Sequence, residues 1–164
     1  MISTKVILTG SFGVGKTSLF NQFLFNKFSE RYLTTIGVNV KKKIIKVEEE
    51  ELSILLWDIA GEISQDKVPN SYFLGASGII YVFDVTRPLT YKNLTSDIDY
   101  LKSKIPGVKV KVVGNKKDLI TPQQLLELEE ELSQPADIYS SAKTGENVEA
   151  LFEILGRAIL GKEA

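Results

Sequence analysis

Residues 6 to 17 read Val-Ile-Leu-Thr-Gly-Ser-Phe-Gly-Val-Gly-Lys-Thr, an apolar strand that continues directly into the motif Gly-x-x-x-x-Gly-Lys-Thr. Gly13 and Gly15 permit the backbone angles that let consecutive N–H groups surround a phosphate, and the helical pattern that follows presents its positive N-terminal end to the same anion. Lys16 can reach the terminal phosphates of a nucleotide, and the Thr17 hydroxyl can ligate Mg²⁺. The segment therefore predicts a phosphate-binding loop, although a glycine-rich turn between a strand and a helix has the same pattern.

The overall composition fits one domain. The chain has 164 residues, of which 43% are hydrophobic, which suffices for one core and leaves no room for a second catalytic domain. We therefore expect residues 1–164 to form a single domain. Lys and Arg total 20 against 21 Asp and Glu, so no net field would recruit nucleic acid or an anionic membrane.

Cysteine and histidine are both missing from the sequence. The lack of Cys excludes disulfides, thiolate metal sites and Cys nucleophiles, and it predicts no lipid anchor on this chain because prenylation and palmitoylation need a thiol. The lack of His excludes a His-based general base or triad. A transition-metal site would have to use carboxylates alone.

Nothing in the sequence predicts a membrane span. The most apolar run, residues 78–83, ends at Asp84 and is far shorter than the ~20 residues that a spanning helix needs. The N-terminus also lacks the charged region and apolar stretch of a signal peptide. We therefore expect a cytoplasmic protein.

Hydrophobic periodicity alternates between strand and helix patterns along the chain. Strands are expected at residues 6–10, 38–47, 52–58, 79–84, 108–113 and 136–139, and helices at 17–26, 72–76, 94–105, from 122 onward and at 148–160. Thr121 and Pro122 have the residue types of an N-cap and a first helical position. The alternation predicts an α/β fold with a six-stranded, mostly parallel sheet, one antiparallel edge strand and helices on both faces. Ligands of such sheets bind beyond the C-terminal ends of the strands.

A run of three lysines, Lys41 to Lys43, falls within the expected strand 38–47. Charged side chains, Lys above all, protect a solvated edge strand from pairing with other chains, which is the interpretation that we favour. A docking patch for an acidic partner is the alternative.

Five motifs occur in a fixed order along the chain. They are Gly-x-x-x-x-Gly-Lys-Thr at 10–17, Thr-Ile-Gly at 35–37, Asp-x-x-Gly at 58–61, Asn-Lys-x-Asp at 115–118 and Ser-Ala-Lys at 141–143. Together they resemble the Ras superfamily of small GTPases over nearly the whole chain, and residues 72–86 with Trp57 and Asp58 are most similar to its Rab branch. The resemblance implies a P-loop NTPase fold, a single G domain at 1–164 and a small monomeric GTPase. Such a protein is a guanine-nucleotide-binding switch that hydrolyses GTP to GDP and phosphate.

The Asn-Lys-x-Asp motif has a chemical interpretation of its own. The Asp118 carboxylate can accept hydrogen bonds from both N1–H and the exocyclic amino group of guanine, whereas adenine would present a lone pair to it. Sites of that kind reject the wrong partner by about 10⁴ to 10⁵. We expect Asn115 to connect this loop to the phosphate-binding loop and Lys116 to lay its aliphatic stem along the base. A solvated turn would have the same residue types.

Further base contacts are implied by the resemblance. Ala142 matches the residue whose backbone N–H meets the guanine carbonyl oxygen, and Lys143 the residue that braces this loop. Phe28 matches the aromatic that packs against the base, although a core residue at a helix end is the alternative. The predicted nucleotide-binding set is Gly13, Val14, Gly15, Lys16, Thr17, Ser18, Phe28, Tyr32, Thr35, Asn115, Lys116, Asp118, Ser141, Ala142 and Lys143.

Magnesium is the predicted metal, with Thr17 and Thr35 as direct ligands and Asp58 orienting a coordinated water. With triphosphate bound, the Thr35 loop can close on the metal and the γ-phosphate, which the Gly61 N–H can also reach, and loss of that phosphate releases both segments. The resemblance implies that residues 32–40 and 61–72 contact effectors, an exchange factor and an activating protein, whose identities the sequence does not give. The predicted catalytic set is Lys16, Thr35, Gly61 and Glu62.

Two residues depart from the family pattern at the catalytic centre. Glu62 occupies the position of a usual Gln. Its carboxylate can accept from water but cannot donate to phosphate, and its charge faces an anion, so both assistance and hindrance of hydrolysis are open. Phe12 occupies a loop position that is usually Gly or another small residue, where a ring would crowd an incoming arginine finger worth about 10³ to 10⁵ in rate. We expect slow turnover that such a finger does not stimulate, unless the Phe12 ring swings outward.

These departures keep a second function open, a pseudo-GTPase interaction module that binds guanine nucleotide without cycling. A P-loop kinase or ATPase is disfavoured by Asp118 and by the lack of a lid. Residues 36–40 read Ile-Gly-Val-Asn-Val where the Rab branch has Ile-Gly-Val-Asp-Phe, and the lipidated Cys tail is missing. A prokaryotic Ras-like GTPase or a shortened chain would explain the tail equally well.

Overall fold

The computed structural model describes residues 1–28, 38–59 and 68–163. Its strands are β1 (Ile2–Gly10), β2 (Val38–Val47), β3 (Glu50–Ile59), β4 (Ala76–Asp84), β5 (Lys109–Asn115) and β6 (Ile138–Tyr139). Its helices are α1 (Lys16–Phe25), α2 (Asn70–Phe73), α3 (Leu94–Lys104), α4 (Pro122–Glu131) and α5 (Val148–Ile159), with short 3₁₀ turns η2 (Pro88–Thr90) and η3 (Lys117–Leu119). None of the helices in these ranges has the length and hydropathy that a membrane span requires.

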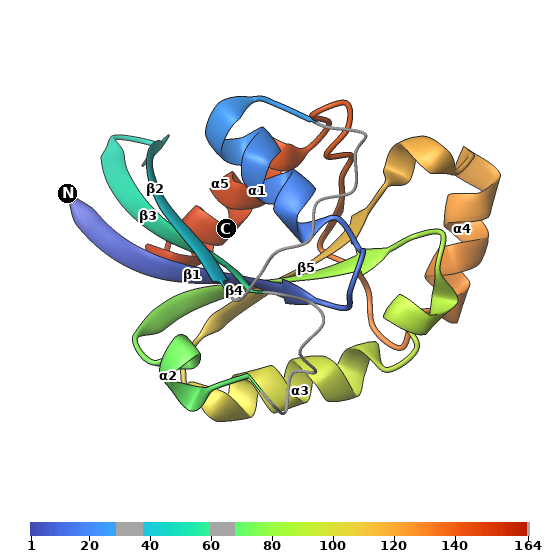
Figure 1. Ribbon diagram of the computed structural model, residues 1–164, viewed down its shortest axis with the longest axis horizontal. Coiled ribbons are helices and arrows are strands. Elements are labelled where there is room, and N and C mark those ends of the chain that lie inside the picture. The colour runs from blue at the N-terminus through green and yellow to red at the C-terminus, as the bar shows by residue number, and fades with distance from the viewer. Residues whose placement is uncertain (29–37, 60–67, 164) are drawn as a thin grey trace.

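The strands form one sheet in the order β2-β3-β1-β4-β5-β6. β2 runs antiparallel to β3, and every other pair is parallel. The predicted mostly parallel sheet with an antiparallel edge strand is therefore confirmed. The order also places the ends of β1, β4 and β5 next to one another at one edge, where their following loops meet (Figure 1).

Helices cover both faces of the sheet, as predicted. α1 and α5 lie on one face and α2 and α3 on the other (Figure 1). The first face has its core between β1, β3 and the two helices, where the rings of Phe23 and Phe152 stack with centroids 3.6 Å apart. On the other face, Leu94, Ile98 and Leu101 of α3 are buried in the second core. Burial on both sides explains the continuous apolar run of β4.

Several predicted boundaries were wrong. β1 begins at Ile2 rather than at residue 6, β4 begins at Ala76 rather than at residue 79, and β5 covers Lys109–Asn115 rather than residues 108–113. The helix expected at 72–76 is α2, which ends at Phe73, because Ala76 and Gly78 pair with Lys5 and Val6 and belong to β4. β3 begins at Glu50 rather than Leu52, since Glu50 and Glu51 continue the antiparallel pairing with β2. β6 has two residues rather than four, and α3 ends one residue early, before an extended Ile105. In each case strand pairing or a local turn took precedence over periodicity.

The start of α4 is formed as predicted. The Thr121 hydroxyl accepts from the Gln124 N–H at 3.1 Å, and the Gln124 side chain accepts from the Thr121 N–H at 2.8 Å. This reciprocal pair is a capping box with Pro122 at the first helical position. The cap matters for function because it fixes the chain just after the Asn-Lys-x-Asp segment.

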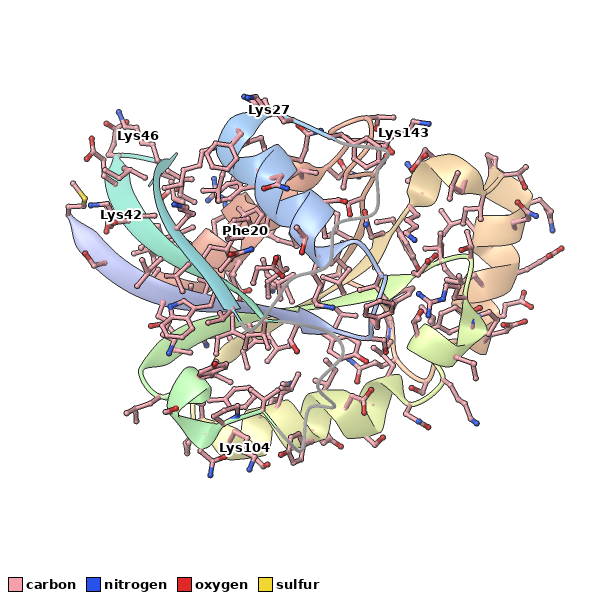
Figure 2. All side chains as sticks on the ribbon, viewed as in Figure 1. Phe20, Lys27, Lys42, Lys46, Lys104 and Lys143 are labelled. Carbon is pink, nitrogen blue, oxygen red and sulfur yellow. The ribbon has the colours of Figure 1, made fainter. Side chains whose placement is uncertain are left out.

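The lysine run lies on β2, at the edge of the sheet. Lys41, Lys42 and Lys46 are exposed, and Lys42 and Lys46 project from this edge in Figure 2. Lys43 is different, because its ammonium bonds the Phe23 carbonyl, lies over the Phe23 ring and approaches the Glu149 carboxylate at 3.4 Å. The edge-strand interpretation therefore fits Lys41 and Lys42 of the run, while Lys43 packs β2 against α1 and α5.

Candidate functional site

The glycine-rich loop connects the end of β1 to the first turn of α1. Gly10 has a φ of 147°, and a Cβ at this position would collide with the Val82 carbonyl oxygen of β4. Gly15 has a φ of 100°, in the left-handed region, and a Cβ there would collide with the Asn115 side chain. Both glycines are required because the loop lies directly against the ends of β4 and β5.

Lys16 lies inside this loop and is 6% exposed. Its ammonium donates to the carbonyl oxygens of Gly10 at 3.1 Å and Ser11 at 2.8 Å. Burial lowers the pKa of Lys16 to about 8 from 10.5, opposed by the negative Asp58 and reinforced by the positive Arg87. A buried cation held among backbone carbonyls is suited to a polyanion such as a nucleotide phosphate chain.

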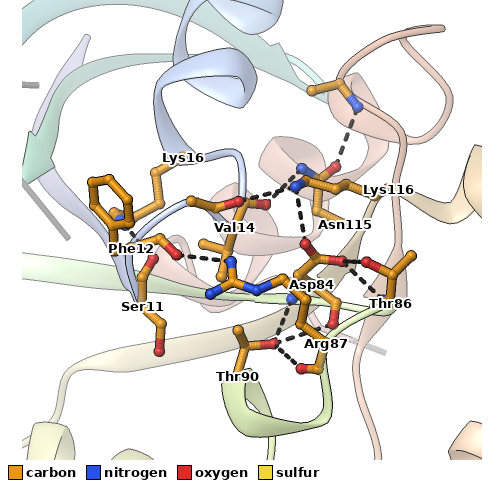
Figure 3. Close-up of polar contacts among 12 residues, drawn as sticks. Ser11, Phe12, Val14, Lys16, Asp84, Thr86, Arg87, Thr90, Asn115 and Lys116 are labelled. Carbon is orange, nitrogen blue, oxygen red and sulfur yellow. Dashed lines mark hydrogen bonds and ion pairs between the residues drawn. The ribbon is translucent and has the colours of Figure 1, made fainter. Parts of the chain in front are cut away.

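Two side chains from the end of β5 hold the outer side of the loop (Figure 3). Asn115 donates to the Val14 carbonyl at 3.0 Å, which confirms the predicted connection between the two motifs. Lys116 donates to the Gly13 carbonyl at 3.0 Å and forms an ion pair with Asp84 at 2.9 Å. The Lys116 head is thus fixed on the loop, and the contact of its stem with a base stays a prediction.

Asn115 also organises the loop between β6 and α5. It is 1% exposed, and its carbonyl oxygen accepts from the Ser140 hydroxyl at 3.1 Å and from the Ala142 N–H at 3.2 Å. A guanine carbonyl at Ala142 would therefore share an N–H that Asn115 already uses. Asn115 is the side chain through which the phosphate-binding and base-binding segments are joined.

One oxygen of the Asp118 carboxylate is held by the loop between β6 and α5. Its Oδ1 accepts from the Ser141 hydroxyl at 2.8 Å, and Ser141 in turn accepts from the Thr144 N–H at 3.1 Å. Asp118 is exposed, so its carboxylate can reach a ligand beyond the end of β5. This arrangement is compatible with the two-point guanine contact that the sequence predicts.

Two of the three predicted metal residues, Thr17 and Asp58, lie together where β3 ends and α1 begins, and the third, Thr35, is outside the described residues. The Thr17 hydroxyl donates to Asp58 Oδ2 at 2.7 Å, and Asp58 is completely buried. Among the described residues no group of three His, Cys, Asp or Glu side chains could hold a metal ion. One hydroxyl and one carboxylate fit Mg²⁺, which prefers oxygen ligands and completes its shell with waters and phosphate oxygens.

The remaining predicted residues fall into two groups. Ser18 is in the first turn of α1, Ser141 and Ala142 are buried, Lys143 is exposed, and Phe28 is 38% exposed just beyond α1. The exposure of Phe28 argues against the alternative that it is a core residue at a helix end. Tyr32, Thr35, Gly61 and Glu62 lie outside the described residues.

Sequence reasoning missed three residues at this site. The Gln22 amide donates to the Ala142 carbonyl at 2.8 Å. Asp84 is completely buried, accepts from the Thr86 hydroxyl at 2.6 Å, and pairs with Lys116. Arg87 donates to the Phe12 carbonyl at 2.9 Å. A usable signal existed for Asp84 alone, because an acidic residue that ends a buried strand of a parallel sheet lies at the ligand edge.

The pKa of Lys16 predicts a pH-dependent stability of the nucleotide-free protein. Between pH 8 and about 10.5 the unfolded chain binds more protons at Lys16 than the folded chain, so the free energy of unfolding rises with pH in that window, by about 3 kcal/mol in total. Urea unfolding of the wild type and Lys16→Met, without nucleotide, measures this. Above pH 8, the free energy of unfolding of the wild type should rise relative to that of Lys16→Met by about 1.4 kcal/mol per pH unit. A difference that stays constant from pH 7 to 10 would contradict the assignment.

A loop of backbone donors around a buried lysine, at the C-terminal edge of a parallel sheet, defines a P-loop nucleotide-binding protein. The sequence pattern of the Ras family matches residues 5–161. The Ras-related protein Rab-1 of Theileria annulata is 36% identical over 166 residues, covering 96% of this chain and 74% of that protein. Human Ras-related protein Rab-4B is 36% identical, over 96% of this chain and 76% of that protein. The Ras-related protein SEC4 of Saccharomyces cerevisiae is 34% identical, over 96% of this chain and 75% of that protein.

The chain therefore belongs to the Ras family of small GTPases. It is a GTP-binding switch protein and an enzyme that hydrolyses GTP. The Rab relatives agree with the resemblance of residues 72–86 to the Rab branch.

Proposed function

We propose that residues 1–164 act as one monomeric G domain that binds GTP or GDP with Mg²⁺, hydrolyses GTP slowly, and contacts effectors through residues 32–40 and 61–72 in the GTP state. The observation that carries the proposal is the position of Asn115. It bonds the phosphate-binding loop at Val14 and the base-binding loop at Ala142, so one nucleotide can occupy both.

The proposal assigns a task to each main residue of the site. The Lys16 ammonium and the N–H groups of Gly13 to Gly15 bind the phosphates, and Asp118 selects guanine. Thr17 and Asp58 would hold Mg²⁺, directly and through a water respectively. When bound, Mg²⁺ neutralises charge on the β- and γ-phosphate oxygens. We assign the ordering of the γ-phosphate segments to Thr35 and Gly61, and the placement of the attacking water to Glu62.

The nucleotide that copurifies with the protein tests this proposal. Denaturation and chromatography of the released nucleotide should give GDP or GTP in about equal amount to the protein. Labelled GDP bound in the presence of Mg²⁺ should be displaced by excess GTP and resist excess ADP, and Trp57, next to Asp58, should report GDP-to-GTP exchange by its fluorescence. Displacement by ADP would favour an ATP-using P-loop enzyme instead. Absence of guanine nucleotide binding in the presence of Mg²⁺ would contradict the proposal.

Slow hydrolysis is attributed to Phe12. Its side chain is 42% exposed, and its carbonyl is held by Arg87, so the ring is carried on a fixed section of the loop. We expect Phe12→Gly to raise the single-turnover rate of GTP cleavage about tenfold, which corresponds to about 1.4 kcal/mol of barrier. The control is Leu126→Ala, which removes an exposed apolar side chain on α4. Equal rates for Phe12→Gly and the wild type would remove Phe12 from the explanation.

Multiple turnover separates a slow GTPase from a module that does not cycle. With excess GTP and Mg²⁺, the wild type should release more than one phosphate per protein over hours. Release that stops at one phosphate per protein would favour the pseudo-GTPase interpretation.

A further inference from the structure

The phosphate-binding loop is held from outside by a third side chain, which belongs to none of the sequence motifs. Arg87 follows β4, and its Nη1 donates to the Phe12 carbonyl at 2.9 Å (Figure 3). It also lies against the next residue, because a Cβ added at Gly13 would be 3.1 Å from the same nitrogen. Three consecutive carbonyls, those of Phe12, Gly13 and Val14, thus accept from Arg87, Lys116 and Asn115.

Because peptides are planar, these three hydrogen bonds also fix the direction of the N–H groups in the loop. In a trans peptide the C=O of one residue and the N–H of the next point in opposite directions. Carbonyls of residues 12 to 14 that point outward to side chains therefore direct the N–H groups of residues 13 to 15 toward the interior of the loop. Arg87 governs the first of these, the N–H of Gly13.

The backbone that carries Arg87 is itself fixed. The Arg87 N–H donates to the Asp84 carbonyl at 3.0 Å. Its carbonyl accepts from the Thr90 hydroxyl at 2.7 Å, and Thr90 is 3% exposed. The guanidinium thus extends from a rigid turn, and the charge-assisted bond to Phe12 needs little ordering of the chain.

We infer that Arg87 is a positioning residue for phosphate binding, which holds the Phe12–Gly13 peptide with its N–H turned toward the bound diphosphate. The inference rests on the proposed function, since it assumes that the loop holds a guanine nucleotide. Arg87 acts through the loop backbone and also adds positive charge behind the phosphates. Asn115 and Lys116 hold the next two peptides in the same way, so loss of Arg87 frees one peptide of three.

The test compares nucleotides that differ in their number of phosphates. Arg87→Ala should weaken GDP binding about tenfold, the effect of one charge-assisted hydrogen bond. The substitution should weaken GMP binding less, because GMP places one phosphate fewer in the loop. The ratio of GDP affinity to GMP affinity should therefore fall. Arg87→Lys retains the charge and one donor and should recover part of the loss. Fluorescent GDP with Mg²⁺, displaced by unlabelled GDP or GMP, gives these affinities.

Arg157→Ala is the matched control, since Arg157 is on α5 and pairs with Glu153 and Glu48 rather than with the loop. Arg87 is exposed, and thermal unfolding of the nucleotide-free variants establishes that they fold. The assignment of Arg87 is overturned if Arg87→Ala has the same GDP affinity as Arg157→Ala, or if it loses GDP and GMP affinity by the same factor. Either result leaves the proposed function intact. If the wild type binds no guanine nucleotide, the proposed function fails, and this assignment with it.

Discussion

Asp118→Asn is expected to reverse the base preference of the protein from guanine to xanthine, with a change in the affinity ratio on the order of 10⁴. The carboxylate accepts two hydrogen bonds from guanine. An amide presents a donor where guanine also donates, whereas xanthine offers a carbonyl at that place. A bound base would cover these polar groups, and the mismatch would leave them unpaired away from water, which is why the expected effect is large.

The structure indicates that this substitution changes the base contact without releasing the loop. Asp118 Oδ1 accepts from Ser141, and the asparagine Oδ1 can accept the same bond, so the loop keeps its anchor while the other atom becomes a donor. Displacement of fluorescent GDP by unlabelled GDP and XDP measures the ratio. Asp99→Asn, an exposed carboxylate on α3, is the control. An unchanged preference in Asp118→Asn would remove Asp118 from the base site.

Asn115→Ala is expected to lower the affinity for both GDP and GTP by a factor of about 10² to 10³. The substitution leaves three groups without their partner, the Val14 carbonyl, the Ser140 hydroxyl and the Ala142 N–H. Each unsatisfied buried group costs about 1 to 3 kcal/mol, and ordered water can compensate for part of that. Because these groups belong to both halves of the site, the loss should appear for any nucleotide, unlike the base-selective effect of Asp118→Asn.

The measurement is the dissociation rate of fluorescent GDP and GTP in the presence of Mg²⁺, together with thermal unfolding of the nucleotide-free protein. Asn93→Ala, an exposed asparagine that makes no side-chain cap at the start of α3, is the matched control. If the dissociation rates of Asn115→Ala match those of the control, Asn115 does not join the two loops in solution.

Periodicity predicted most of the fold because local patterns and the final packing agree. The buried run of β4 and the capping box of α4 are both visible in the chain itself. The start of β3 at Glu50 was missed because Glu50 pairs with Val47 across a tight hairpin whose acidic residues have the pattern of a longer turn. The start of β4 at Ala76 was missed because pairing with Lys5 of the distant strand β1 extends β4 beyond its apolar core. No pattern within a short window contains that information.

The site was predictable to the extent that its residues form compact motifs. Asn115 could be connected to the phosphate-binding loop in advance because parallel strands bring their C-terminal ends to the same side of the sheet, and the structure identifies the Val14 carbonyl as its partner. Arg87 could not be found, since a lone arginine after a strand has no spacing signature. Its contact with the Phe12 carbonyl exists only because β4 lies next to β1 in the sheet.

The sequence by itself determined the chemistry of this protein: glycines that leave room for an anion, one lysine for its charge and one carboxylate for a base. These properties are carried by residue types at short spacings, so they are readable without a structure. Only the tertiary structure decided that Arg87 and the head of Lys116 also hold the loop that presents them. The orientation of a peptide N–H depends on what the carbonyl of the same peptide contacts, and those partners come from segments 75 and 101 residues away in the sequence.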